Sequence, residues 1–184
     1  MAKSTRIGYD SGLFHVICRG NNKQELFKDE KDYQRYLSTL QRFKKKYPFR
    51  LYAYCLMPNH VHLLMEIKDA SLSKIMQAIN LSFFWWHKKK YDYSGHLWQG
   101  RFKSLPIGKE DYLFACSRYI ELNPVRAGLE IDASHYKWSS YRVYAFGEEN
   151  KLIDTHFISE LISDKQEEQQ AKYREGVVAA LNLR

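Results

Sequence analysis

Residues 49–67 read FRLYAYCLM-PN-HVHLLMEI, and this stretch decides the fold. Two apolar and aromatic runs, Phe49–Met57 and His60–Ile67, flank the turn-forming pair Pro58-Asn59. Such runs, separated by two turn residues, predict antiparallel strands joined as a hairpin. This hairpin is the centre from which the rest of the fold is built outward.

The sequence around the hairpin completes a pattern of six elements. Strands are predicted at Leu13–Arg19 and Gly100–Ile107, the second at a sheet edge because proline at position 106 cannot donate a ladder hydrogen bond. Helices are predicted at Asp29–Lys46 and Ser71–Lys90, where apolar residues recur at spacings of three and four. The order β-α-β-β-α-β predicts an α+β, ferredoxin-like split β-α-β fold, with a four-stranded antiparallel sheet and helices on one face.

More helices are expected after the sheet. They are predicted at Glu110–Leu122, Trp138–Phe146, Phe157–Ile162 and Gln166–Leu183. Asn123-Pro124 is expected to stop the first of them, because the residue before a proline disfavours helix. We predict a catalytic domain over residues 1–128 and a C-terminal helical extension over residues 129–184.

Positive charge is concentrated in the first 128 residues. The formal net charge of the chain is +8, yet residues 1–128 hold 22 Lys and Arg against 11 Asp and Glu, whereas residues 129–184 hold 7 against 10. A basic body attracts polyanions, because neutralising phosphates releases condensed counterions. We therefore expect a nucleic-acid partner rather than a basic surface that binds nothing.

The cysteines and the N-terminus favour a cytoplasmic protein with no membrane association. Cys18, Cys55 and Cys116 lie far apart, without the spacing of a zinc knuckle or a redox pair. Buried reduced thiols are expected, which favours a reducing compartment. No apolar run follows Met1–Arg6 as in a signal peptide, and no run is long enough to span a bilayer.

His60 and His62 are candidate metal ligands. In a strand, residues two apart point to the same face, so the two imidazoles are expected side by side, with Val61 facing the opposite layer. Paired imidazoles suit a divalent metal ion. Metallo-β-lactamase-like sites continue with a nearby Asp-His, amidohydrolase barrels need roughly 250 residues, and two-histidine phosphodiesterases carry two His-x-Ser/Thr copies; none of these patterns is present.

Tyr119 and Asn123 lie four residues apart on a predicted helix, so they share a face. The amide oxygen of Asn123 is a candidate third metal ligand, and the phenol of Tyr119 is a candidate nucleophile toward phosphorus. A free phenol, with a pKa of about 10, is a weak nucleophile near neutral pH, and a metal beside the scissile phosphate makes the reaction easier. Tyr112, two turns earlier, is the rival nucleophile.

Several short motifs follow one another in order along the chain: Phe14–Val16 with Arg19–Asn22, Met57–His62, Trp98–Phe102, Arg118–Gly128 and Trp138–Tyr141. In this order they resemble the REP-associated tyrosine transposases of bacteria, which belong to the single-tyrosine, His-hydrophobic-His, IS200-like transposases. The resemblance runs from about residue 6 to about residue 144.

The resemblance implies a ferredoxin-like fold, a Mg²⁺ or Mn²⁺ ion, and single-stranded DNA substrates next to REP-like hairpins. It implies that His60 and His62 ligate the metal with Asn123 as the third ligand, and that Tyr119 forms a 5′-phosphotyrosine during cutting and rejoining. Whether the chain acts as a monomer or as a homodimer stays open.

Cations, one asparagine and one aromatic residue are predicted to contact DNA, with Trp98 expected in a loop where it can stack on an unpaired base. The predicted DNA-binding residues are Arg19, Asn21, Lys88, Lys89, Lys90, Trp98, Arg101, Lys103, Arg118 and Arg126. The alternative is a ferredoxin-like nucleic-acid-binding regulator without cleavage activity. That reading explains the charge but leaves His60, His62 and Tyr119 without a role.

Overall fold

A computed structural model describes residues 11–108 and 110–182 of the chain. Its elements, in chain order, are β1 (Gly12–Arg19), η1 (Asn21–Lys23), α1 (Glu30–Lys46), β2 (Phe49–Met57), β3 (His60–Ile67), α2 (Leu72–Tyr91), β4 (Lys103–Pro106), α3 (Glu110–Glu121), α4 (Asn123–Arg126), η2 (Ala133–His135), α5 (Tyr141–Phe146), α6 (His156–Ile162) and α7 (Gln166–Asn182). Met1–Arg6 and Leu183, the predicted end of the last helix, lie outside the described residues.

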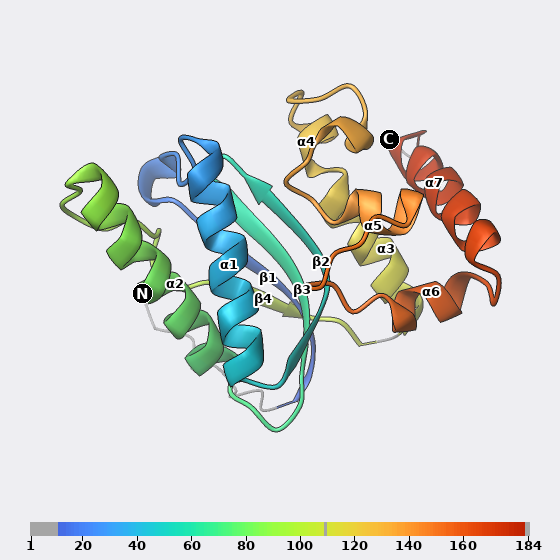
Figure 1. The fold of residues 1–184 in the computed structure, drawn as a ribbon, viewed down its shortest axis with the longest axis horizontal. Coiled ribbons are helices and arrows are strands. Elements are labelled where there is room, and N and C mark those ends of the chain that lie inside the picture. The colour runs from blue at the N-terminus through green and yellow to red at the C-terminus, as the bar shows by residue number, and fades with distance from the viewer. Residues whose placement is uncertain (1–10, 109, 183–184) are drawn as a thin grey trace.

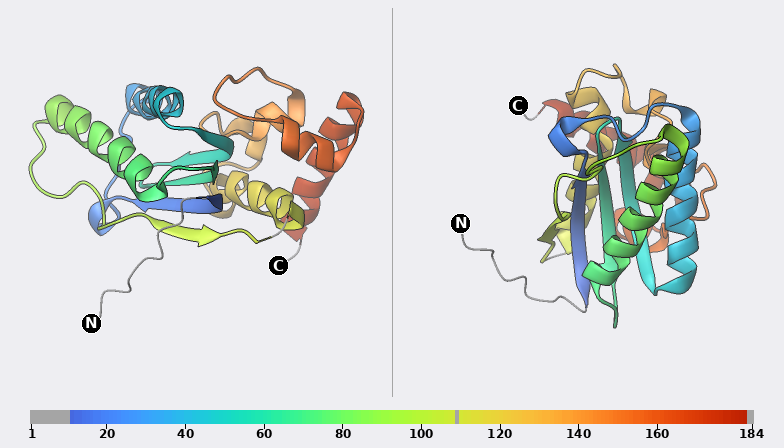
Figure 2. Two further views of the ribbon diagram at one scale, coloured as in Figure 1. Left: turned by 90° about the horizontal axis from the view of Figure 1, so that it is seen from below. Right: turned by 90° about the vertical axis from the view of Figure 1, so that its left-hand side faces the viewer.

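The four strands form one sheet in the order β2-β3-β1-β4, and every neighbouring pair is antiparallel. The two helices that connect strands, α1 and α2, contact each other and lie together against one face of the sheet (Figures 1 and 2). The predicted ferredoxin-like arrangement is therefore confirmed. α3, which follows the last strand, packs against β2 and β3.

Local sequence explains where the central elements begin and end. Asp29 caps α1 through a reciprocal capping box with Asp32, which satisfies free backbone N–H groups at the start of the helix. α1 ends at Lys46, with Tyr47 as its C-cap. Pro48 follows directly and prevents the helix from continuing, and β2 begins at the next residue. Pro58 and Asn59 make the tight turn between β2 and β3, as expected from the sequence.

Alternation along β1 divides the side chains between two faces. Phe14, Val16 and Cys18 are buried toward α1 and α2, and the Cys18 thiol lies 3.4 Å from the amide nitrogen of Asn80 on α2. His15 and the other alternate residues of β1 therefore point to the opposite face, which also carries His60 and His62. We call this second face the histidine face.

Apart from shifts of one residue, the elements differ from the prediction in three places. β4 is shorter than expected, because Gly100 adopts a left-handed conformation (φ 68°) in a turn before the strand. α5 begins at Tyr141 rather than Trp138, because residues 138–140 bond to β2 instead. Asn123-Pro124 ends α3 but also opens the short helix α4, since Pro124 is tolerated in a first helical turn.

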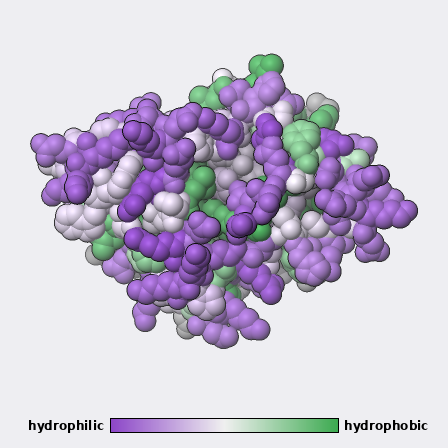
Figure 3. Space-filling view, viewed as in Figure 1, coloured by the Kyte–Doolittle hydropathy of each residue, from purple (hydrophilic) through white to green (hydrophobic). Residues whose placement is uncertain are grey.

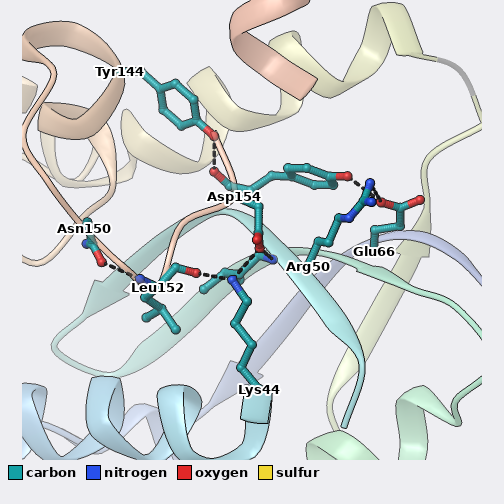
Figure 4. Close-up of polar contacts among 9 residues, drawn as sticks. Lys44, Arg50, Glu66, Tyr144, Asn150, Leu152 and Asp154 are labelled. Carbon is teal, nitrogen blue, oxygen red and sulfur yellow. Dashed lines mark hydrogen bonds and ion pairs between the residues drawn. The ribbon is translucent and has the colours of Figure 1, made fainter. Parts of the chain in front are cut away.

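The segment after α5 seals the outer edge of β2 (Figure 4). The Asp154 backbone N–H donates to the Leu51 carbonyl over 2.9 Å, and the Asp154 carboxylate accepts from the Leu51 N–H over 2.8 Å. Lys44 of α1 donates to the same carboxylate over 2.5 Å, and the Tyr144 hydroxyl donates to the Tyr52 carbonyl over 2.7 Å. An exposed edge strand invites pairing with other chains, and these contacts remove that edge.

The helices beyond residue 128 gather beside α3 and β2, so residues on both sides of the predicted domain boundary pack together (Figure 1). The division at residue 128 stays a prediction. The face shown in Figure 3 is largely hydrophilic, with apolar side chains exposed only in small patches. Within the part of the chain that the structure describes, no helix has both the length and the apolar character to cross a membrane.

Candidate active site on the histidine face

Cross-strand pairing arranges the polar residues of the histidine face in rows. Arg19 of β1 pairs with His60 of β3. One row further along, Ile17 pairs with His62 on one side and with Lys103 of β4 on the other. Directly paired residues of antiparallel strands share a face, so two cations and two imidazoles lie on one surface. α3 covers the half of this face that β2 and β3 form. On the other half, formed by β1 and β4, the side chains of Arg19 and Lys103 are exposed.

His60 and His62 lie with their ring centroids 4.9 Å apart. Desolvation by burial lowers the pKa of His62 to about 2 and that of His60 to about 4, with the positive charge of Arg19 acting in the same direction. Both imidazoles are therefore neutral near pH 7, which is the form that binds metal ions. The predicted side-by-side placement of the two rings is confirmed.

Asn59 determines which nitrogen of His60 carries the proton. The Oδ1 atom of Asn59 lies 2.6 Å from Nδ1 of His60, and a carbonyl oxygen accepts hydrogen bonds only. Nδ1 of His60 is therefore the donor, and Nε2 keeps its lone pair. From the sequence, Asn59 is predicted only as a turn residue; its place next to the first histidine is the signal for this second role.

His15 is the third histidine of the site, and no role for it is predicted from the sequence. Its Nε2 lies 2.8 Å from Nδ1 of His62, and the two rings stack with centroids 5.1 Å apart. Both side chains are buried, and desolvation lowers the pKa of His15 to about 4. Only strand register reveals this contact, because the two residues are 47 positions apart in sequence.

Tyr119, and not Tyr112, is the candidate tyrosine whose ring contacts the histidines. Its ring centroid lies 5.9 Å from that of His15 and 6.3 Å from that of His62, edge-on in both cases. The side chain is 47% exposed, so it contacts the histidines and also faces solvent. Tyr112, the rival, is 62% exposed, and no ring contact between it and a histidine is found among the described residues.

Asn123 and Arg126 surround the end of α3. The Asn123 amide nitrogen donates to the carbonyls of Tyr119 (2.9 Å) and Ile120 (3.0 Å), which directs its donor group into the helix end and leaves Oδ1 as the acceptor. The Arg126 guanidinium lies 4.9 Å from the Tyr119 ring centroid and donates to the carbonyl of the same residue over 3.3 Å. A cation therefore stands beside the candidate nucleophile.

A buried carboxyl holds α3 in place. Glu121 is fully buried and lies two residues after Tyr119. Its carboxyl oxygens lie 2.5 Å from the Ser140 hydroxyl and 2.6 Å from the Tyr173 hydroxyl of α7. The Ser140 backbone N–H donates in turn to the Tyr54 carbonyl of β2 over 3.0 Å. This network links α3 to the sheet and to α7, and burial raises the pKa of Glu121 to about 7.

The donors on the histidine face fit a divalent metal ion. Within the described residues, no hydrogen-bond partner reaches the buried Nε2 of His62, so this atom is free to ligate. No group of three His, Cys, Asp or Glu side chains that could hold one ion occurs in that part of the chain. A third protein ligand would therefore be of another type, as the amide oxygen of Asn123 is.

Three of the predicted DNA-binding residues lie close together. Two backbone hydrogen bonds hold the loop before β4 against the end of β1. The Gln99 N–H donates to the Arg19 carbonyl, and the Asn21 N–H donates to the Leu97 carbonyl, both over 2.8 Å. Arg101 belongs to this loop and is exposed. Arg19, Asn21 and Arg101 therefore gather at one end of the sheet, on the side of His60.

Two other predicted DNA-binding residues are held in contacts within the protein. Lys90 pairs with Asp29 and Asp32 at 2.7 and 2.8 Å, so its charge is already compensated. Arg118 donates to the Gly176 carbonyl of α7 over 2.8 Å. These contacts give both residues a structural role and weigh against the DNA contacts predicted for them. Lys88 and Lys89 are exposed at the end of α2.

Trp98 is also less free than expected. Its indole N–H donates to the Asn80 carbonyl over 3.0 Å, and its ring lies 6.0 Å from that of Phe83 in the core. Trp85, on the outer side of α2, is the exposed tryptophan, at 56%. The loop position of Trp98 suggested exposure, but the loop folds back onto α2.

Comparison with known proteins agrees with the fold. The family model described as "Transposase IS200 like" matches residues 9–123, more than half of the chain. A protein of Haemophilus influenzae, provisionally named a REP-associated tyrosine transposase, is 28% identical over 142 residues, which cover 70% of this chain and 78% of that protein. The structure of a REP-associated tyrosine transposase bound to a REP hairpin superposes with a TM-score of 0.66 at 22% identity, over 84% of this chain and 94% of that one. The chain belongs to the IS200-like transposase family.

Proposed function

We propose that this transposase cleaves and rejoins single-stranded DNA next to hairpins through a covalent bond between Tyr119 and a 5′ phosphate. The observation that carries the proposal is the contact of the Tyr119 ring with His15 and His62 within one chain. This contact supports an active site in which the tyrosine serves the histidines of its own chain.

His60, His62 and Asn123 are the residues that would hold a Mg²⁺ or Mn²⁺ ion. Such an ion, when bound, acts as a Lewis acid that polarises the scissile phosphate and orients it. The fit rests on two neutral imidazoles and on the unpartnered Nε2 atom of His62. Hard divalent ions retain waters and prefer oxygen ligands, which suits an amide oxygen and phosphate oxygens.

Tyr119 Oη forms a bond to phosphorus while the bond from phosphorus to the 3′ oxygen breaks. The phenolic proton passes to solvent, and the departing 3′ oxygen takes up a proton to become a hydroxyl. The phosphotyrosine bond keeps the energy of the broken phosphodiester, so attack by another 3′ hydroxyl rejoins the strand without a nucleotide cofactor. Arg126, over the Tyr119 ring, holds the aromatic ring and places a positive charge beside the reacting phosphate.

Phosphate contacts supply most of the DNA affinity in this proposal. The exposed side chains of Arg19, Arg101 and Lys103 lie beside or on the histidine face, where a strand entering the site must pass. A hairpin partner is supported by the structural relative that was solved bound to a REP hairpin. We infer the same class of partner for this chain.

The test uses an end-labelled single strand that carries a hairpin, incubated with the protein and Mn²⁺ and resolved on a denaturing gel. We expect a covalent protein–DNA adduct with the wild-type protein and none with Tyr119→Phe. No adduct should form when EDTA is present from the start of the incubation. Tyr112→Phe is the matched control and should retain the adduct. DNA binding without any adduct in the wild-type protein would favour a non-cleaving regulator instead.

A further inference from the structure

The buried contact between His15 and His62 has the geometry of a hydrogen bond that orients a metal ligand. The two nitrogens, Nε2 of His15 and Nδ1 of His62, are 2.8 Å apart, and both rings are nearly inaccessible to solvent, at 5% and 4% exposure. His15 lies in the middle of β1, a strand that is paired on both sides, so its backbone position is rigid.

One proton lies between the two nitrogens, and its place determines what His62 can do. If His15 donates, Nε2 of His62 carries the other proton, which would be a buried donor without an acceptor among the described residues. Such a donor is costly. If Nδ1 of His62 donates instead, its Nε2 presents a lone pair, which is the state that a metal ligand requires.

We propose that His15 is a positioning residue that accepts a hydrogen bond from Nδ1 of His62 and so directs the Nε2 lone pair of His62 toward the metal. The inference rests on the proposed function, because it assigns a role toward the metal site. Asn59 plays the corresponding part for His60, where the carbonyl oxygen can only accept. Both histidines are then set to ligate through Nε2.

Outer partners of ligating histidines commonly change metal affinity by about 10- to 100-fold when they are removed. His15→Phe keeps an aromatic ring beneath Tyr119 and removes the acceptor. His15→Gln keeps an acceptor oxygen on a side chain of similar reach. His87→Phe is the matched control, because His87 is a buried histidine on α2 at 1% exposure, away from the histidine face.

The first measurement is Mn²⁺ affinity by calorimetry on the DNA-free proteins. We expect His15→Phe to weaken binding about 10- to 100-fold, and His15→Gln and His87→Phe to stay within about threefold of wild type. If His15→Phe binds Mn²⁺ as tightly as the wild type while His62→Ala loses binding, the role of His15 is overturned and the metal site stands. Equal Mn²⁺ binding by the wild-type protein and His62→Ala would overturn the proposed metal site and the role of His15 with it.

The second measurement is independent of metal binding and of catalysis. Nitrogen-15 NMR of histidine-labelled, metal-free protein reports which ring nitrogen of His62 is protonated. We expect a protonated Nδ1 and an unprotonated Nε2 in the wild type, and a mixture of tautomers in His15→Phe. A wild-type His62 protonated at Nε2 would overturn the proposal even if every variant folds normally.

Discussion

Glu121 should make the stability of this protein decrease as pH rises through the range from 5.5 to 8. The carboxyl is fully buried on α3, and desolvation raises its pKa from 4.5 to about 7. The folded state therefore keeps a proton that the unfolded chain releases between these two pKa values. Since the folded state binds more protons there, raising the pH favours unfolding.

The size of the effect follows from the pKa difference. Each pKa unit corresponds to 1.36 kcal/mol, and about 1.4 units of the difference fall between pH 5.5 and pH 8. The free energy of unfolding should therefore lose on the order of 2 kcal/mol from this group alone over that interval. Glu121→Gln removes the titration and retains polar atoms next to Ser140 and Tyr173.

Urea unfolding of both proteins at pH 5.5 and at pH 8 tests this reasoning. The stability of Glu121→Gln relative to wild type should improve by about 2 kcal/mol from the lower to the higher pH, and this double difference cancels groups common to both proteins. Glu175→Gln, at an exposed position on α7, should follow the wild-type profile. Parallel profiles for Glu121→Gln and wild type would refute the assignment of a protonated Glu121 in the fold.

Three further predictions concern the surroundings of the site. Gly20→Ala should lower the free energy of unfolding by about 2 kcal/mol in a urea titration, because an added Cβ would lie 2.2 Å from a backbone carbonyl oxygen; unchanged stability would contradict that close approach. Arg126→Ala should slow covalent adduct formation on the order of tenfold, about 1.4 kcal/mol, and Arg126→Lys less, measured as single-turnover rates; equal rates in all three proteins would remove Arg126 from the site. Trp98→Ala should cost about 2–3 kcal/mol of stability and Trp85→Ala less than about 0.5 kcal/mol, since only the first ring packs on the core; the reverse order by urea unfolding would contradict the packing.

The strands and helices of the sheet could be predicted because they follow from local patterns. The two strands of the central hairpin begin and end at the predicted residues, and α1 and α2 agree with prediction to within one residue. Alternation along β3 was enough to place His60 and His62 side by side. The departure at residues 138–140 arises because this segment bonds to the distant strand β2, and no local pattern encodes that pairing.

The sequence by itself determined the fold class, the pair of histidines on one strand face, and a short set of candidate tyrosines. These follow from the spacing of apolar residues, from turn-forming residues and from the order of short motifs, all of which are properties of residues close together in the chain. Only the tertiary structure decided that Tyr119 rather than Tyr112 meets the histidines, that His15 bonds to His62, and that Arg118 and Lys90 are occupied within the protein. These contacts depend on strand register and on the rotation of α3 over the sheet. That rotation is held by the buried bonds of Glu121 to residues far away in the chain.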